Sequence, residues 1–226
     1  MTPRRLLPLA VLGLLAACSA PAPPNYYTLV PDAQSAAAPA AGPGRAGVID
    51  LMPVSVPAPI DIPQVVVRTG QGEVVPLNGE RWAGPLADEI RSALAARLAS
   101  RLGMPVVQDL RPDPGTRAWR VQVEVQRFDS LPGRQAVLDA VWRVRSPVGP
   151  RAGSGTAKVP DAAGEAASRS GTGGRSTPVC RSHFETPATE DIAALVQAHQ
   201  RNLAALGDAI ASAAENAEAG RPACPG

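Results

Sequence analysis

Cysteine and histidine are the residues of this chain that could carry covalent, acid–base or metal chemistry, and both are scarce. The sequence holds three cysteines, Cys18, Cys180 and Cys224, and two histidines, His183 and His199. A cysteine can act as a nucleophile, ligate a metal or form a disulfide, and a histidine exchanges protons near neutral pH. These five side chains are therefore the candidates for such chemistry.

Their spacing does not predict a catalytic or metal site. Cys180 and His183 stand three residues apart in a segment rich in glycine and serine, which fixes no geometry between a nucleophile and its base. His199 falls on the apolar stripe of a predicted helix, where we interpret it as an imidazole packed in the core or at its rim. The cysteine and histidine spacing typical of zinc is missing. We expect no enzyme activity, no metal and no cofactor.

Two glycine-rich stretches, 153–158 and 171–176, resemble a phosphate-binding loop only superficially. Their glycine spacing differs from that of the phosphate loop, and Arg175 stands where a lysine is needed. Neither a strand nor a helix is predicted beside them. We expect both stretches to be solvated loop.

The first residues are typical of an exported protein. Arg4 and Arg5 precede an apolar run over 6–15, and two alanines follow directly before Cys18. A charged head, a short apolar core and small residues at the cleavage point are the marks of a secretory signal. The apolar run is shorter than the roughly 20 residues of a membrane span. Residues 1–17 are therefore predicted to be removed.

The sequence Leu15-Ala16-Ala17-Cys18 also resembles the lipobox of bacterial lipoproteins. That resemblance implies that the Cys18 thiol takes a diacylglycerol and that the new amino group is acylated, with palmitate as a typical chain. Two or more acyl chains anchor a protein stably in a membrane. Ser19 follows where an aspartate would retain the protein at the inner membrane, which implies transfer to the outer membrane.

Charge argues against nucleic acid as a partner. The chain carries 22 basic and 20 acidic side chains, and loss of Arg4 and Arg5 with the signal leaves 20 of each. A formally neutral chain has no basic excess to release counterions from a phosphate backbone.

Cys180 and Cys224 lie on opposite sides of a predicted long helix, so their pairing stays open. An extracytoplasmic location permits a disulfide. The helix spans about 40 Å at ~1.5 Å per residue, and closure requires both flanks to run back along it. The alternative is a pair of free thiols.

Hydrophobic patterning predicts both strands and helices. Apolar and β-branched runs, or strict alternation of apolar and polar residues, predict strands at 26–30, 48–54, 65–68, 73–77, 106–107, 119–126 and 136–145. The proline-rich segment 57–63 is predicted to be an extended connector or an edge strand. Apolar residues at every fourth position predict a helix from Trp82 to Leu102, and a second over 189–215 with Thr189 as its N-cap.

These patterns predict an α+β fold in two layers, with a mixed or antiparallel sheet and two amphipathic helices packed on one face. One flexible segment, 146–180, is predicted to hold at most one short strand, at 156–159. The expected organisation is a removed signal at 1–17, a lipidated tether at 18–25, one domain over 26–217, and a tail at 218–226.

Several motifs, taken in order, make the chain similar to the PqiC-like family of ABC-type transport auxiliary lipoproteins. No single motif is specific, but their order and spacing are. They are the lipobox at Cys18, Tyr26-Tyr27-Thr28-Leu29, Ile60-Asp61-Ile62-Pro63 with Gln64-Val65-Val66-Val67-Arg68, Arg81-Trp82-Ala83-Gly84-Pro85-Leu86-Ala87-Asp88, Leu138-Asp139-Ala140-Val141-Trp142, and Leu195-Val196-Gln197-Ala198-His199. Residues 146–180 are longer and less strand-like than the family pattern.

The resemblance implies an outer-membrane lipoprotein, facing the periplasm, in an MCE-type lipid transport system that supports membrane integrity. Its expected partners are a tunnel-forming MCE protein, the inner-membrane permease and further copies of itself in a ring. Candidate partner contacts are Tyr26, Tyr27, Ile60, Asp61 and Ile62, because exposed aromatic and extended segments suit interfaces. The alternative is a lipid carrier that shields acyl chains between the sheet and the helices.

Overall fold

The fold is seen in a computed structural model that describes residues 22–32, 46–70, 72–109, 111–113, 116–145, 178–222 and 224. The predicted signal, Cys18, both glycine-rich stretches and the strand predicted at 156–159 lie outside these residues. Among the described helices, none is long and apolar enough to cross a membrane.

The strands form two sheets, and their order in the chain differs from their order in space. The strands are β1 Asn25–Tyr27, β2 Val48–Leu51, β3 Gln64–Arg68, β4 Val74–Trp82, β5 Val106–Val107, β6 Ala118–Leu131, β7 Gln135–Arg145 and β8 Cys180–Pro187. A five-stranded sheet has the order β5-β2-β6-β7-β8, and a three-stranded sheet has the order β1-β4-β3. In the larger sheet β2 is parallel to β5 and β6, whereas β6, β7 and β8 are antiparallel.

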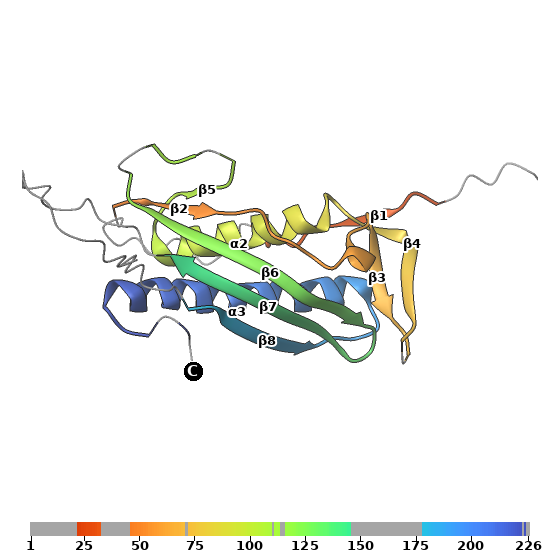
Figure 1. Ribbon diagram of the computed structural model, residues 1–226. Coiled ribbons are helices and arrows are strands. Elements are labelled where there is room, and N and C mark those ends of the chain that lie inside the picture. The colour runs from red at the N-terminus through yellow and green to blue at the C-terminus, as the bar shows by residue number, and fades with distance from the viewer. Residues whose placement is uncertain are drawn as a thin grey trace, which may run out of the picture.

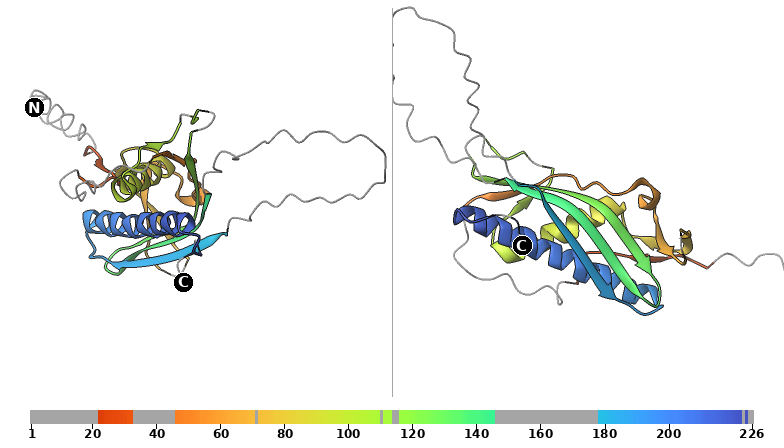
Figure 2. Two further views of the ribbon diagram at one scale, coloured as in Figure 1. Left: turned by 90° about the vertical axis from the view of Figure 1, so that its left-hand side faces the viewer. Right: turned by 60° about the horizontal axis from the view of Figure 1, so that its bottom comes forward.

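Two long helices cover one face of the larger sheet. They are α2, Leu86–Leu102, and α3, Ile192–Glu218. They pack against one another, and α3 also packs on β7 and β8. Figure 2 shows both helices on the same side of the strands. The predicted α+β class and the placement of both helices are confirmed, with the strands divided between two sheets.

The core lies between the helices and this sheet, and it is aliphatic apart from a few aromatic rings. Along β6 the inward residues Trp119, Val121, Val123 and Val125 are buried, and Leu94 and Leu98 of α2 are fully buried. Burying one such side chain stabilises a fold by roughly 1.5–3 kcal/mol. The alternating apolar residues of β6 therefore face the apolar residues at every fourth position of α2 across the core.

The helix α2 begins later than the sequence pattern predicts. Trp82 is the last residue of β4 rather than the first apolar position of the helix. It is nonetheless buried, because β4 ends beside the core. Gly103 ends the helix at a φ of 63°, in the left-handed region that glycine adopts without strain.

The N-cap of α3 also differs from the prediction. Asp191, not Thr189, caps the helix, and its carboxylate accepts a hydrogen bond from the backbone N–H of Ala194 at 3.2 Å. Aspartate caps at least as well as threonine and adds a negative charge at the positive end of the helix dipole.

The sequence does not predict strand β8, because residues 146–180 are expected to be flexible and His183 follows in a segment rich in glycine and serine. Its inward residues Cys180, Ser182, Phe184 and Thr186 alternate with exposed charged or polar residues. The alternation is thus present, but it is carried by small and polar inward residues that a hydrophobicity pattern misses.

The connector 57–63 is not wholly extended. Its residues Ala58–Ile60 form one turn of 3-10 helix, η2, which begins at Pro57 and ends at Asp61. Proline has a fixed φ that suits the first turn of a helix, which explains a turn in so proline-rich a segment.

The elements give the molecule two distinct ends (Figure 1). One end holds the small sheet β1-β4-β3, the turn between β6 and β7, and the N-termini of both helices. The other holds β5, the C-terminal end of α3 and the first residue of β8. We call these the β1 end, after its first strand, and the disulfide end, after the bridge between Cys180 and Cys224.

Candidate functional site

A cleft of about 360 Å³ lies where the two sheets meet, on the face of the larger sheet that the helices leave open. Pro57, Pro59 and Ile60 from η2 and Val66 and Val74 from the β3–β4 hairpin form its apolar walls. The lipid-carrier alternative expected a space between sheet and helices; this cleft is instead on the opposite face.

The floor of the cleft is an ion-pair cluster that joins the two sheets. Asp129 accepts a hydrogen bond from Arg127 Nε at 2.6 Å and from Arg68 Nη2 at 3.2 Å. The Asp129 side chain is only 10% exposed, so this carboxylate depends on both guanidinium groups for compensation.

A β-bulge explains why charged residues of β6 reach this face. The register shifts between Val125 and Arg127. One extra residue reverses the facing of those that follow, so Phe128 turns to the core and Arg127 and Asp129 turn outward. We did not single out these residues from the sequence. The usable signal is the break in alternation after Val125.

A second cluster of charged side chains extends from this floor across the open face of the larger sheet. In register, Arg127 of β6 lies opposite Asp139 of β7, which lies opposite His183 of β8. His183 Nδ1 contacts Asp139, and His183 Nε2 lies 3.3 Å from Glu185 Oε1. The hydrogen bond to Asp139 is the main cause that raises the pKa of His183 above its usual value. This histidine therefore serves in an exposed ion pair.

The predicted partner contacts gather at the β1 end. Ile60 lines the cleft, Asp61 is exposed beside it, and Ile62 is half-buried. Tyr26 pairs with Arg81 of β4 in the same three-stranded sheet. The structure thus places the proline-rich connector and β1 at one end of the molecule, although 30 or more positions separate them in sequence.

The two tyrosines of β1 differ in their surroundings. Tyr26 is 65% exposed, whereas Tyr27 packs against the core. Burial, followed by the hydrogen bond and charge of Glu80, raises the pKa of Tyr27 to about 12. Tyr27 is therefore a packing residue in this fold, and Tyr26 is the one free to contact something else.

His199 lies in the core rather than at its rim, the two places that its position on the helix stripe left open. It has no exposed surface, and its ring stacks on Phe128 at a centroid distance of 3.8 Å. Ser130 Oγ lies 2.9 Å from His199 Nε2, a pairing that could suggest a nucleophile and its base. Burial lowers the pKa of His199 to about 3, however, so this imidazole cannot take up a proton near neutral pH.

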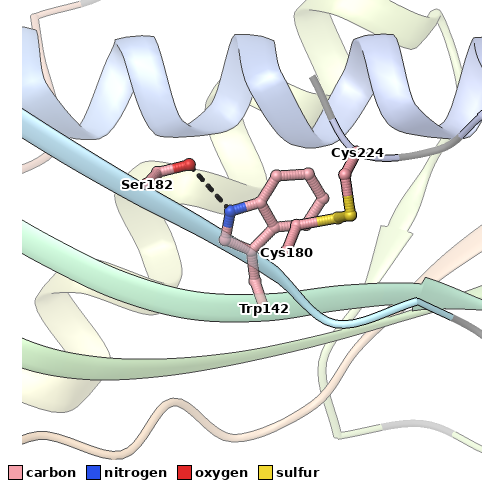
Figure 3. The surroundings of a disulfide bond; sticks show 4 residues. All are labelled: Trp142, Cys180, Ser182 and Cys224. Atoms are coloured by element: carbon pink, nitrogen blue, oxygen red, sulfur yellow. Dashed lines mark hydrogen bonds between the residues drawn. A yellow bond between two sulfur atoms is a disulfide. The ribbon is translucent and has the colours of Figure 1, made fainter. Parts of the chain in front are cut away.

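Cys180 and Cys224 form a disulfide rather than a pair of free thiols (Figure 3). Their Cα atoms lie 5.3 Å apart. The closure is achieved because β8 runs back along α3, so that Cys180 stands beside the end of the helix. Trp142 lies next to the bridge, and its Nε1 donates a hydrogen bond to Ser182 at 2.9 Å. The bridge fixes the disulfide end.

The part of the chain that the structure describes contains no group of three or more His, Cys, Asp or Glu side chains placed to hold a metal ion. The lipidation site at Cys18 remains a prediction from sequence, because it precedes the described residues.

Solved structures show the same fold at low sequence identity. A crystal structure of an uncharacterized protein matches with a TM-score of 0.58 and 19% identity, covering 84% of this chain and 97% of the other. Protein XCC0632 from Xanthomonas campestris, of the family DUF330, matches with a TM-score of 0.55 and 16% identity, covering 81% of this chain and 90% of the other.

The family assignment comes from the sequence itself. No curated protein matches it. Residues 27–211 match the family described as ABC-type transport auxiliary lipoprotein component, a stretch that runs from β1 through most of α3. That family is a transport component rather than an enzyme family. The chain therefore belongs to the ABC-type transport auxiliary lipoprotein components.

Proposed function

We propose that this protein is the outer-membrane lipoprotein subunit of an MCE-type lipid transport system, where it docks the tunnel-forming component that spans the periplasm. The observation that carries the proposal is the family match over residues 27–211, which begins nine positions after the cysteine of a lipobox-like sequence, Cys18. A lipidated domain holds its partner at the membrane without chemistry of its own, and it thereby supports membrane integrity.

The proposed partner contact is the connector beside the cleft. Ile60, Asp61 and Ile62 offer two branched apolar side chains around one exposed acid. The 3-10 turn and the Arg68–Asp129 pair hold this segment in place. A preordered contact loses less conformational entropy on binding than a mobile one does. Several copies arranged in a ring would present this segment repeatedly to a central tunnel.

The docking role is tested by affinity capture of the full lipidated protein, solubilised in mild detergent from its own cells. We expect co-purification of an MCE-type protein and its permease. Asp61→Arg should lower the captured amount by about tenfold, equivalent to ~1.4 kcal/mol. Thr116→Arg, an exposed change at the disulfide end, is the matched control and should capture normally. Recovery of no envelope transport protein by the unmodified chain would refute docking.

The lipid carrier remains a second candidate because of one observation, the apolar walls of the cleft beside Ile60 and Val66. Mass spectrometry of the domain purified without its anchor separates the two functions. Stoichiometric phospholipid that is lost on Ile60→Asp favours the carrier, and a lipid-free domain favours docking.

A further inference from the structure

The β1 end lies close to the anchor point, whatever path the tether takes. Asn25, the first residue of β1, is seven residues after Cys18, and Pro21, Pro23 and Pro24 stand between them. A fully extended chain spans at most ~3.6 Å per residue, so Asn25 lies within about 25 Å of Cys18. This step rests on lipidation of Cys18, which is part of the proposed function.

The strand β1 is fixed to the rest of the domain, so the tether orients the whole molecule. Its residues pair with β4 from Glu80 to Trp82. Directly after the strand, Glu89 of α2 accepts hydrogen bonds from Thr28 Oγ1 at 2.7 Å and from the Leu29 N–H at 2.8 Å. Gln200 of α3 donates to the Thr28 carbonyl at 3.0 Å. These contacts therefore fix the segment that follows the tether to both helices.

Tyr26 is the exposed aromatic side chain at this end. It is 65% exposed on an edge strand, while its neighbour Tyr27 packs inward. An exposed tyrosine has an apolar ring and a polar tip, and tyrosine is enriched at the level of lipid headgroups. That layer is about 5–8 Å deep on each side of a bilayer, a depth that one tyrosine side chain can enter.

Charge at the β1 end selects the kind of lipid. Asp88 and Glu89 lie in the first turn of α2, and Asp191 caps α3. Glu80 and Asp191 are close enough to Tyr27 to help raise its pKa. Arg81, opposite Tyr26 on β4, and the exposed Arg134 in the turn between β6 and β7 are basic side chains at the same end, and the four acids named here outnumber them. An acidic surface is repelled by anionic lipid and tolerated by zwitterionic lipid.

We propose that the β1 end is a membrane-contacting surface for zwitterionic phospholipid, with Tyr26 at headgroup level beside the acylated Cys18. The disulfide end then points away from the bilayer, beyond α2, which is about 25 Å long (Figure 1). This orientation assigns Tyr26 to lipid and leaves Ile60, Asp61 and Ile62 for the protein partner.

Brominated lipids test the contact, because bromine quenches only nearby tryptophan. Trp82, Trp119 and Trp142 are all at most 4% exposed, so the native background is shielded. The full lipidated protein carrying Tyr26→Trp is reconstituted into phosphatidylethanolamine and phosphatidylcholine vesicles, with and without bromine on the acyl chains. The matched control is Asp113→Trp, an exposed position in the loop that follows β5.

We expect brominated vesicles to quench the added fluorescence of Tyr26→Trp by at least twofold and to leave Asp113→Trp unchanged. Replacing half of the lipid with phosphatidylglycerol at low salt should weaken the quenching. Equal quenching at both positions, or stronger quenching with anionic lipid, would overturn the proposed surface. Unmodified protein that fails to float with the vesicles would instead refute the anchor.

Discussion

At the scale of single residues, the two histidines show how environment separates side chains that are alike in sequence. His183 is exposed between Asp139 and Glu185, which raise its pKa, so its protonated form is favoured. His199 is buried against Phe128, and burial lowers its pKa to about 3. The helix stripe predicted that His199 packs in the core or at its rim. The acids around His183 were unforeseen, because they come from a strand pairing that was not predicted.

His199 makes the fold sensitive to acid. Its pKa is about 3 when folded and 6.5 when unfolded, so between these values the unfolded chain binds the extra proton. Stability is therefore full above pH 6.5 and falls as the pH drops toward 3, by up to about 1.4 kcal/mol per pH unit. Urea unfolding of wild type and His199→Leu at pH 7, 5.5 and 4.5 measures this contribution.

The leucine variant should be less stable than wild type at pH 7 by about 1–3 kcal/mol, because Ser130 loses its partner. That deficit should shrink as the pH falls. Adding Ser130→Ala serves as a control, because it removes the orphaned hydroxyl without changing the pH trend. A deficit that stays constant from pH 7 to 4.5 would show that His199 is not buried in its neutral form.

Gly47 is a position where the backbone leaves no room for a side chain. Its φ is 132°, and an added Cβ would lie 2.5 Å from the carbonyl oxygen of Arg117. That carbonyl also accepts the Val48 N–H at 2.9 Å, where β2 joins β6. Gly47→Ala should therefore cost about 2–4 kcal/mol in thermal or urea unfolding.

Gly79 is the matched control for this substitution. An added Cβ there meets nothing within 4 Å, so Gly79→Ala should change the unfolding free energy by less than ~0.5 kcal/mol. Equal effects at both glycines would contradict the close approach of β2 and β6.

At the scale of elements, apolar periodicity predicted the strands and the helix that bury apolar side chains. It missed the strand whose inward side chains are partly small or polar. The paired strands β6 and β7 and the body of α2 follow directly from the sequence. The strand β8 escaped because Ser182 and Thr186 face inward in place of aliphatic residues. Arg91 is the converse: it looks like a solvated helix residue, yet it is buried and donates to the Leu51 carbonyl at 2.8 Å. The burial of such residues depends on contacts with residues that are distant in sequence.

The disulfide should carry much of the stability of the disulfide end. It closes a loop with a sequence separation of 44, for which chain entropy gives about 4 kcal/mol. Cys224→Ser should lower the unfolding free energy by roughly 2–4 kcal/mol, and a reductant should do the same to wild type. The reductant should leave Cys224→Ser unaffected. Titration of two thiols in unfolded protein that was never reduced would contradict the bridge.

At the scale of the whole molecule, function depends on the arrangement of the two ends. The tether leads to β1, and the cleft with its Arg68–Asp129 pair lies at the same end. The disulfide closes the opposite end. The fold class and the family that the sequence predicted are confirmed, and the anchor at Cys18 stays a prediction. The split into two sheets and the cleft between them could not be predicted, because they depend on a β-bulge and on ion pairs between distant segments.

The anchor is the central claim, and Cys18→Ser tests it most directly. The change leaves every described residue untouched but removes the thiol that would receive lipid. Cells expressing either form are fractionated into inner membrane, outer membrane and soluble periplasm, and the chain is followed by immunoblot. Wild type should be found in the outer membrane and be released only by detergent, and the folded variant should be soluble in the periplasm. A processed variant that still partitions into the outer membrane would contradict the account.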